Sequence, residues 1–569
     1  MWSNLRNLTR NADGAVAPTV GLSLFALIAA GGLAFDYARL ASLDTELQQA
    51  ADQAALAAVT QLDQELSSTT RAVAAARTLL TNQTLFGNDG GTVAIETGQD
   101  ATVNGNTVAR VTFYSTKSDA EAATNGYAAS TAADLTARFV KVDVTGREAV
   151  YALTPIGRAF RSGIVNASAV AGLGSAICKV PPVMICNPAE PDTNTNANYP
   201  FDGNSLAGRG LRLISVGNGN TAWAPGNFGY LDVGSSTSNP NVELREALGW
   251  LTARGDCSGL DGVRTRTGAG TPVTQALNTR FDIYEKANTG NGNAASCPTG
   301  SFCPPSINAV KDVFQRGTPN NANQCGIANN TEWQLPDEGV RYRPTSTVDL
   351  TQAQADALQI MGHPRDKCHA MSINGTCSSG KIGDGAWDRN AYFRANYGWT
   401  SAQWPTFVGQ GNVSARITTF SSTRPTRYEV YLWEIANRGT VIGSRTILPV
   451  GGRALSAGGN PPTDHDRPVC SAFQSPPSGT GVIPGSGNVD RRRISAAVLN
   501  CHAHNVHGGG GTVYPVIKWI EMFLVEPSLN RGDRTDANDV YVEIIGETTL
   551  GSGASAGQVV RRDVPYLVK

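Results

Sequence analysis

The sequence predicts an α+β protein that begins with a transmembrane helix, continues this helix beyond the membrane, and ends in a disulfide-stapled region of mixed helices and strands. Three observations predict this class. An apolar run without charges covers residues 14–35, ten cysteines all lie after residue 177, and short β-branched segments alternate with Gly- and Pro-rich stretches. The expected domains are a short N-terminal segment (1–13), the transmembrane helix (14–35), a helix with a small α+β subdomain (36–175), and a Cys-, Gly- and Pro-rich α+β domain (176–569).

The composition limits the classes of function. The 569 residues carry 46 Lys and Arg against 47 Asp and Glu. A formal charge of −1 lacks the basic field that nucleic-acid binding requires, so we expect no nucleic acid among the partners. The 62 Gly and 29 Pro predict long loops, whereas a hydrophobic content of 41% is too high for a disordered chain.

The apolar run from Gly14 to Phe35 matches the roughly 20 helical residues that cross the hydrocarbon of a bilayer. A cleaved secretory signal is the alternative, but its apolar part has only about 7 to 15 residues. Arg6 and Arg10 precede the run, and basic residues favour the cytoplasmic side of a membrane. We therefore expect a single-pass helix with a cytoplasmic N-terminus and the bulk of the chain on the other side.

The helical pattern continues past the membrane, because apolar residues recur at three- and four-residue spacing as far as Ala57. A Gly pair near the end of the apolar run would let another helix approach closely. The surface expected to dock other helices consists of Gly31, Gly32, Leu40, Leu43, Leu47, Ala50, Ala54 and Ala57. Packing of the extended stripe on the chain's own domain explains the pattern equally well, and both alternatives stay open.

The segments that follow predict a second helix and then mostly strands. Hydroxyls within residues 67–70 suit the N-cap of a helix through residues 71–80. Residues 350–361 predict a helix that Gly362 stops, whereas the alternation in residues 428–436 predicts a half-buried strand. Further strands are expected at residues 92–96, 107–114, 138–145, 491–501, 512–526 and 539–547.

All ten cysteines follow the membrane segment, in a compartment where disulfides persist. Because no two of them have CxxC spacing, the sequence lacks the basic motif of thioredoxin-like redox sites and of zinc ribbons. Local spacing predicts three candidate disulfides, which join Cys178 to Cys186, Cys297 to Cys303 and Cys368 to Cys377.

The strongest candidate for a catalytic or metal site is the run Cys501-His502-Ala503-His504 with His507, which could bind a transition metal. The run has no Asp or Glu at metal-motif spacing and precedes a Gly-rich segment, so an exposed loop is favoured. Ser555 lies in a Gly-x-Ser-x-Gly string, but no His follows it to complete a hydrolase triad in the usual order.

Two other clusters have ordinary structural explanations. Asp384 and Asp388 could bind a cation, but a turn packed by Trp387 is favoured. The arginines of residues 491–493 could meet lipid phosphates or a carboxylate ladder, whereas a solvated strand start is the commoner arrangement. We therefore predict no catalytic residue, no cofactor and no metal, and we expect that the protein is not an enzyme.

The N-terminal residues resemble a known family. The residues that carry the resemblance are Gly14-Ala-Val-Ala17, the apolar run that closes on Asp36-Tyr37-Ala38-Arg39, and the Ala-rich helix that includes Leu47-Gln-Gln-Ala-Ala-Asp52. They resemble the Flp/Tad-type pilus-assembly proteins, the TadE/TadG-like family. Residues 177–188 and 523–528 look like the exported part of TadG-type members.

The sequence departs from these relatives at two points. Some TadG-type proteins carry a metal-dependent adhesion site, Asp-x-Ser-x-Ser, but the strings that begin at Asp232 and Asp256 each lack one hydroxyl ligand. Prepilin-like relatives are cut after a Gly and carry Glu at the fifth following position, which after Gly14 is Thr19. We therefore expect no adhesion-site metal and a retained anchor.

The resemblance implies a pilin-like helix in a structural, non-enzymatic inner-membrane component of Flp/Tad-type pilus assembly, a type IV-like system, with a periplasmic body. The implied partners are other pilus-assembly proteins, pilin-like subunits and the lipid bilayer. Two alternatives remain. One is a membrane-anchored periplasmic metal-dependent enzyme that uses residues 501–507, and the other is an adhesin or envelope-binding module.

Overall fold

The computed structural model of the chain divides into two compact units. Unit 1 comprises Met1–Ser175 and Asp563–Lys569, and unit 2 comprises Ala176–Arg562. The structure describes residues 16–63, 66–78, 101–103, 106–108, 110–151, 162–178, 183–215, 223, 226–232, 240–251, 262–266, 271–285, 296–298, 300, 302–315, 325–327, 333–370, 377, 381–452, 465–471, 481–485, 488–507, 512–531, 539–548 and 560–568.

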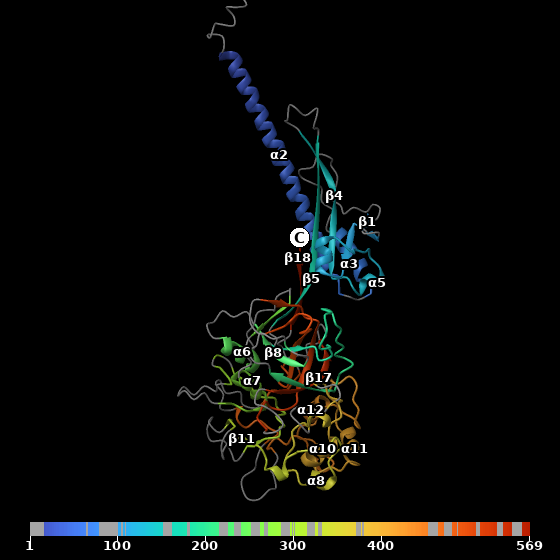
Figure 1. The fold of residues 1–569 in the computed structure, drawn as a ribbon, viewed down its shortest axis with the longest axis vertical. Coiled ribbons are helices and arrows are strands. Elements are labelled where there is room, and N and C mark those ends of the chain that lie inside the picture. The colour runs from blue at the N-terminus through green and yellow to red at the C-terminus, as the bar shows by residue number, and fades with distance from the viewer. Residues whose placement is uncertain are drawn as a thin grey trace, which may run out of the picture. The chain divides into compact units, whose positions relative to one another are not determined.

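Unit 1 is built on one long helix, α2 (Val16–Val59), which Figure 1 shows as an unbroken rod. The apolar run and the Ala-rich extension therefore form a single helix, as the continuous three- and four-residue spacing predicted. The chain then turns into α3 (Ser68–Thr78), the second helix expected. The carboxylate of Asp134 accepts the backbone N–H groups of Ser67 and Thr69 at 2.7 and 2.9 Å, so this side chain satisfies donors at the start of α3.

A four-stranded sheet covers the helices of unit 1, in the order β18-β5-β4-β3. Its strands are β3 (Val111–Tyr114), β4 (Phe139–Val150), β5 (Ser162–Cys178) and β18 (Val560–Leu567). The small elements of the unit are β1 (Ala101–Val103), β2 (Asn106–Val108), α4 (Lys117–Ala122) and α5 (Thr131–Asp134).

Two of the three strand predictions for unit 1 fall on described residues, and both segments contain strands. The strand expected at residues 138–145 is the first part of β4, and the one expected at 107–114 is split between β2 and β3. The strand expected at 92–96 lies outside the described residues. Whereas the sequence predicted one domain from residue 176 to the end, the last strand pairs with β5, so Asp563–Lys569 belong to unit 1.

Unit 2 contains an eight-stranded mixed sheet in the order β15-β9-β8-β6-β14-β16-β17-β7. Neighbours are antiparallel except for β14 with β6 and β7 with β8. Because β7 also pairs with β8, six of the strands close into a ring. The strands are β6 (Val183–Cys186), β7 (Gly210–Ser215), β8 (Asn227–Leu231), β9 (Val263–Arg266), β14 (Arg493–Leu499), β15 (Val513–Tyr514), β16 (Lys518–Leu524) and β17 (Val540–Glu547).

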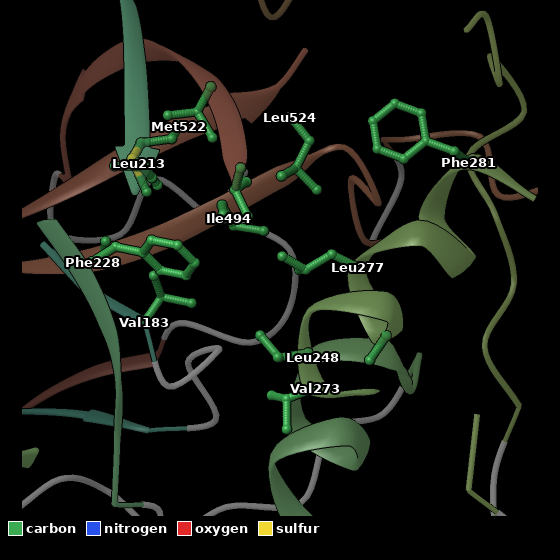
Figure 2. Packing of buried hydrophobic residues seen from close by; sticks show 14 of the residues in the cluster. Val183, Leu213, Phe228, Leu248, Val273, Leu277, Phe281, Ile494, Met522 and Leu524 are labelled. Atoms are coloured by element: carbon green, nitrogen blue, oxygen red, sulfur yellow. The ribbon is translucent and has the colours of Figure 1, made fainter. Parts of the chain in front are cut away.

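The main core of unit 2 lies on one face of these strands. Residues on this face, such as Ile494 on β14 and Met522 on β16, form one cluster with Leu248 of α6 (Pro240–Gly249) and Leu277 of α7 (Thr271–Asn278), and Figure 2 shows Ile494 above Leu277 and Met522 beside Leu213. The opposite face is buried as well, for example at Ala497 and Leu499. Burial on both faces explains why 491–501, 512–526 and 539–547 are rich in apolar residues, and these three strand predictions are confirmed by β14, β15 with β16, and β17.

A group of short helices forms a second, aromatic core in unit 2. They are α8 (Gln352–Asp356), α9 (Lys367–Ala370), α10 (Arg389–Tyr397), α11 (Trp404–Gln410) and α12 (Arg427–Ala436), with the hairpin of β12 (Val441–Ile442) and β13 (Arg445–Thr446). The remaining elements are the pair β10 (Phe314–Gln315) and β11 (Trp333–Gln334), and the 3-10 turns η2 (Thr279–Phe281) and η4 (Glu338–Val340). Rings from α10 and α11 stack, with Phe393 and Trp404 centred 4.8 Å apart, and Trp433 of α12 meets Trp399 edge-on.

The strand predicted at residues 428–436 is wrong, because this segment is α12. Thr426 and Glu429 form a capping box at its start, which is a helix signal that the period-two alternation hid. Seven of its ten residues are buried, so the segment lacks the one-sided apolar stripe by which a helix is usually recognised in a sequence. The helix predicted at 350–361 exists only as α8, which starts at a capping box of Thr351 and Gln354 and ends at Asp356, before the expected stop at Gly362.

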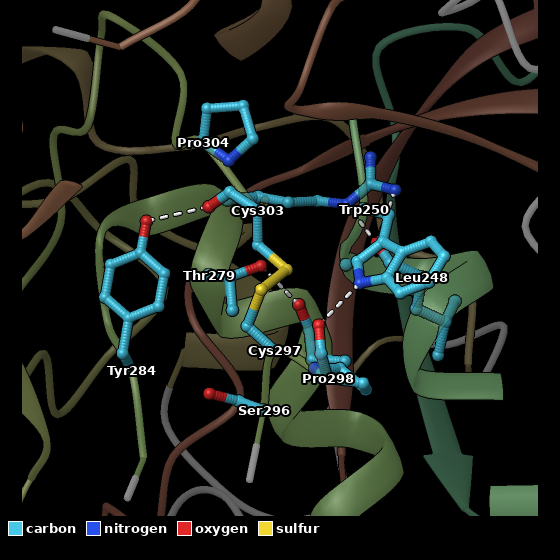
Figure 3. The surroundings of a disulfide bond; sticks show 12 residues. Leu248, Trp250, Thr279, Tyr284, Ser296, Cys297, Pro298, Cys303 and Pro304 are labelled. Atoms are coloured by element: carbon cyan, nitrogen blue, oxygen red, sulfur yellow. Dashed lines mark hydrogen bonds between the residues drawn. A yellow bond between two sulfur atoms is a disulfide. The ribbon is translucent and has the colours of Figure 1, made fainter. Parts of the chain in front are cut away.

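Four disulfides join described cysteines, all in unit 2. Cys297 is bonded to Cys303 and Cys368 to Cys377, the pairs that local spacing predicted. Figure 3 shows the first bridge between Trp250, which donates to the carbonyl of Pro298, and Tyr284, which donates to that of Cys303. The other bridges join Cys186 to Cys501 and Cys325 to Cys470.

The predicted bridge between Cys178 and Cys186 is wrong. Cys186 ends β6, which lies parallel to β14 with Cys186 opposite Leu499. Cys501 follows two residues later, and the two Cα atoms are 5.3 Å apart although 315 positions separate them. A pairing of this length depends on strand topology and cannot be read from local spacing. The side chain of Cys178 lies outside the described residues.

Candidate functional site

The C-terminal half of α2 is part of the core of unit 1. Leu43, Leu47, Ala54 and Ala58 have no exposed surface and pack with strand residues such as Val140. The small Ala side chains let the helix lie close to the sheet, and Figure 1 shows β4 beside α2. Of the two alternatives for the apolar stripe, the structure thus supports packing on the chain's own domain.

The docking surface predicted from Leu40 to Ala57 needs correction for this reason. Leu43, Leu47 and Ala54 are fully covered by their own unit and cannot meet a partner helix without unfolding it. The remaining members, Leu40, Ala50 and Ala57, are half-buried, and Leu40 and Ala50 pack against the same core. Spacing alone could not separate the alternatives, because a helix uses the same three- and four-residue stripe for a partner and for its own sheet.

The N-terminal half of α2 presents the opposite pattern. Its large apolar side chains are exposed, with Leu24 at 55%, Leu27 at 70% and Ile28 at 60%. The others are Val16, Val20, Leu22, Phe25, Leu33, Phe35 and Tyr37. Among the described residues, α2 is the one helix that is long and apolar enough to cross a membrane. An apolar surface of this kind needs a lipid or protein environment.

The predicted glycine pair is divided between two environments. Gly32 is buried, whereas Gly31 is exposed and a Cβ built on it would meet no atom within 4 Å. Gly31 therefore remains a position at which another helix could approach the backbone closely. Asp36, one turn after Gly32, is also buried, with 4% of its surface exposed.

The Cys and His run of residues 501–507 does not converge on one point. Cys501 is in a disulfide, and the backbone amides of His502 and Ala503 donate to the Glu190 carboxylate at 3.1 and 3.0 Å. The ring of His504 lies 3.2 Å from the Ala197 carbonyl, and that of His507 lies 2.7 Å from the Asn505 carbonyl. These side chains anchor a loop through separate contacts.

The aspartates of residues 384–388 hold backbone groups. Asp388 caps α10 by accepting the Ala391 amide at 2.9 Å, and it also accepts the Leu350 amide at 2.8 Å. Asp384 accepts the amide of Ala386 at 3.0 Å. The turn that the sequence favoured over a cation site is therefore present.

Within the described residues, a single group of metal-type side chains gathers closely enough to suggest a metal, namely Cys368, His369 and Cys377. The two thiols form a disulfide, so they offer no thiolate ligand. His369 is engaged with the Tyr541 hydroxyl at 2.9 Å. Ser555 and the two adhesion-site strings after Asp232 and around Asp256 lie outside the described residues.

Both surface roles considered for Arg491–Arg493 are wrong, because Arg491 and Arg492 are fully buried. Arg491 donates to the carbonyls of Pro304, Trp250 and Gly249, the last two at the C-terminal end of α6. Arg492 donates to the carbonyls of Leu524 and Val525 at 2.9 and 3.1 Å. Arg280 binds the same end of α6, because its Nε and Nη2 both donate to the Leu248 carbonyl.

Arg493 pairs with the buried Glu521 of β16. Of the arrangements considered for the three arginines, only this pair resembles the carboxylate ladder. The sequence does contain a signal that these arginines are buried, namely the residues that follow them. Arg491 and Arg492 directly precede β14, which begins at Arg493 and whose other residues are mostly apolar on both faces.

The comparison with family models matches residues 14–61 to the Tad model, Flp pilus-assembly TadE/G-like. The N-terminal module belongs to this family. The matched residues coincide almost completely with α2, so the Tad module comprises both the exposed apolar half and the half that packs on the sheet. The match supports an involvement in Flp/Tad pilus assembly. No curated protein and no solved structure matches the chain significantly.

Proposed function

We propose that this protein is a structural, non-enzymatic component of Flp/Tad pilus assembly, held in the bacterial inner membrane by α2. In this proposal, the exposed half of α2 crosses the bilayer once. The N-terminus is cytoplasmic, and the sheet domains are periplasmic. Its partners are other pilus-assembly proteins and pilin-like subunits.

The observation that carries the proposal is the division of the Tad module at about Asp36. Before this residue the large apolar side chains are exposed, and after it they pack on the sheet of unit 1. A helix of a soluble unit would not leave this many large apolar side chains in water. The division therefore supports an anchor that ends in a folded base.

Charge and disulfides support the orientation. Arg6 and Arg10 precede the apolar segment, which is consistent with a cytoplasmic N-terminus. Four disulfides in unit 2 favour an oxidising compartment on the opposite side.

In this proposal, other helices dock on the exposed part of α2 around Gly31. Because a Cβ at this position meets nothing in the chain's own fold, Gly31→Leu should leave unit 1 intact. In the membrane, the larger side chain would keep a partner helix from approaching the backbone. Gly21 is equally open and lies in the same apolar segment, so Gly21→Leu is the matched control.

The test is crosslinking in intact cells, followed by extraction of the tagged full chain and mass spectrometry of its partners. We expect pilin-like subunits or pilus-platform proteins with the wild type and with Gly21→Leu, and several-fold less with Gly31→Leu. Recovery of the protein alone from wild-type cells would contradict the assembly role. Equal recovery from both variants would contradict docking at Gly31.

A further inference from the structure

The strands β4 and β5 of unit 1 run along α2 toward its exposed apolar half. Asp134 lies shortly before β4 and binds the chain just after the end of α2, through the amides of Ser67 and Thr69. β4 therefore starts near the C-terminal end of α2 and runs back along the helix, and Figure 1 shows it beside α2. The paired residues Val150 and Ser162 are thus the strand ends closest to the exposed half of α2.

One hydrogen bond fixes the position of β5 along α2. The side-chain amide of Gln48 donates to the carbonyl of Ser168 at 3.2 Å. Ile164 lies four residues closer to the start of β5, which is a distance of about 13 Å along a strand. This distance corresponds to about nine residues of α-helix, so Ile164 lies approximately beside Arg39 of α2.

This part of α2 would lie in the headgroup layer of a bilayer that the helix crosses. The uncharged run ends at Phe35, and the headgroups add about 5–7 Å on each side of the hydrocarbon. Arg39 follows Phe35 by four residues, which is about 6 Å of helix. Gly32 and Asp36 are buried by the chain itself, so the fold covers α2 as far as the last turn of the apolar run.

Two exposed side chains at this height suit a lipid surface. Val165 packs on the core of unit 1, so its neighbour Ile164 points to the opposite face of β5, where it is 72% exposed. On α2, Tyr37 is 75% exposed, and Tyr is enriched where membranes meet water. The boundary between headgroups and acyl chains would cover both side chains, together with the apolar surface of α2 that precedes them.

We propose that the end of the β4–β5 pair lies in the headgroup layer and that Ile164 contacts phospholipid there. The bilayer is the partner because this surface begins where the exposed apolar half of α2 ends. The inference rests on the proposed membrane anchor and adds a second contact between unit 1 and the membrane. A contact at a distance from the helix axis would limit the tilt of unit 1 relative to the bilayer.

The test is photo-crosslinking of the full chain in vesicles of phosphatidylethanolamine and phosphatidylglycerol. The photoreactive residue p-benzoylphenylalanine replaces Ile164, Ser168, Tyr37 or Leu24, one position at a time, and mass spectrometry measures the lipid adducts. Ser168 is the matched control, because it is exposed on the same face of β5 and lies about 13 Å farther from the membrane. We expect several-fold more lipid adduct at Ile164 and Tyr37 than at Ser168.

Leu24 separates this inference from the anchor on which it rests. An absence of lipid adducts at Leu24 would contradict the membrane-spanning role of α2 and with it the proposed function. Strong adducts at Leu24 with equal yields at Ile164 and Ser168 would overturn the lipid contact of β5 and leave the anchor intact. Adducts of Ile164 with another protein instead of lipid, when the experiment is repeated in intact cells, would also overturn it.

Discussion

The two units fill their interiors with different chemistry. In unit 1, the core consists mainly of Ala, Val and Leu with Phe113, and residues such as Ala51 and Ala55 let α2 pack closely. In unit 2, the interior also holds fully buried arginines, of which Arg280, Arg427 and Arg492 are examples. The difference follows the backbone, because unit 1 consists largely of one helix and one sheet, whereas much of unit 2 is irregular.

Irregular chain leaves buried carbonyl groups without ladder partners. The guanidinium groups of Arg280 and Arg491 donate to three consecutive carbonyls, from Leu248 to Trp250, where α6 ends. Arg has five donors and stays charged when buried, so it suits this role. The low charge content of this chain therefore does not mean that its interior is apolar. In unit 2, a large part of the positive charge acts as internal scaffolding.

The largest effect is expected for Arg427→Met, which tests whether the buried arginines stabilise unit 2. Arg427 is fully buried between Asp366 at 2.7 Å and Glu543 at 2.9 Å. Removing it leaves two buried carboxylates without their cation, so we expect unit 2 to lose about 3–5 kcal/mol of unfolding free energy. The measurement is denaturant unfolding of the detergent-solubilised chain.

The control for this variant is Arg424→Met, which changes an exposed arginine just before α12. It should shift the free energy of unfolding by no more than about 0.5 kcal/mol. If both variants have the same small effect, the buried arginines are not a scaffold, and the contrast between the two units fails.

The second test is Leu47→Ala in unit 1. Leu47 has no exposed surface, so the truncation should leave a cavity and cost unit 1 about 3 kcal/mol. Leu24→Ala on the same helix removes an exposed side chain and should leave the unfolding free energy of unit 1 almost unchanged. Hydrogen exchange of residues 43–59, read by mass spectrometry, measures both. A loss of protection with Leu24→Ala equal to that with Leu47→Ala would show that α2 is not divided as described.

The smallest expected effect concerns pH and the start of α3. Hydrogen bonds from the hydroxyl and amide of Thr69 hold the pKa of Asp134 below its usual value. Because this pKa is lower in the folded state, ionised Asp134 stabilises the fold fully above its unfolded pKa of about 4. This stabilisation is lost as the pH falls through the pKa of Asp134 in the folded state. The protection of residues 66–78 should therefore decrease at acid pH, after correction for intrinsic exchange rates.

Asp134→Asn keeps an acceptor but does not titrate, so its protection should be lower than that of the wild type at neutral pH and independent of pH. An equal acid-induced decrease in this variant would assign the effect to other groups. Among the described residues of unit 1, the buried charged side chains are Asp36 and Asp134. Asp134 binds the start of one helix, whereas the buried charges of unit 2 pair with one another.

Features that depend on local pattern could be predicted from the sequence. The uncharged run of residues 14–35, its continuation at helical spacing, the α+β class and the short-range pair of Cys297 and Cys303 were all predictable, because each needs only neighbours within a few turns or a few residues. The family resemblance of the N-terminal module lies in the same local stretch.

Other features could not be predicted, because they depend on how segments distant in sequence pack together. Leu43 and Leu47 could face a partner or their own sheet, and only the position of β4 resolves this. Cys186 reaches Cys501 because two distant strands lie parallel. The arginines before β14 have the sequence pattern of a solvated strand start. In the structure, Arg491 instead donates to the carbonyls of Gly249 and Trp250, which are more than 200 residues away in sequence. In each case, the partner is distant in sequence, and its identity depends on how strands and helices pack.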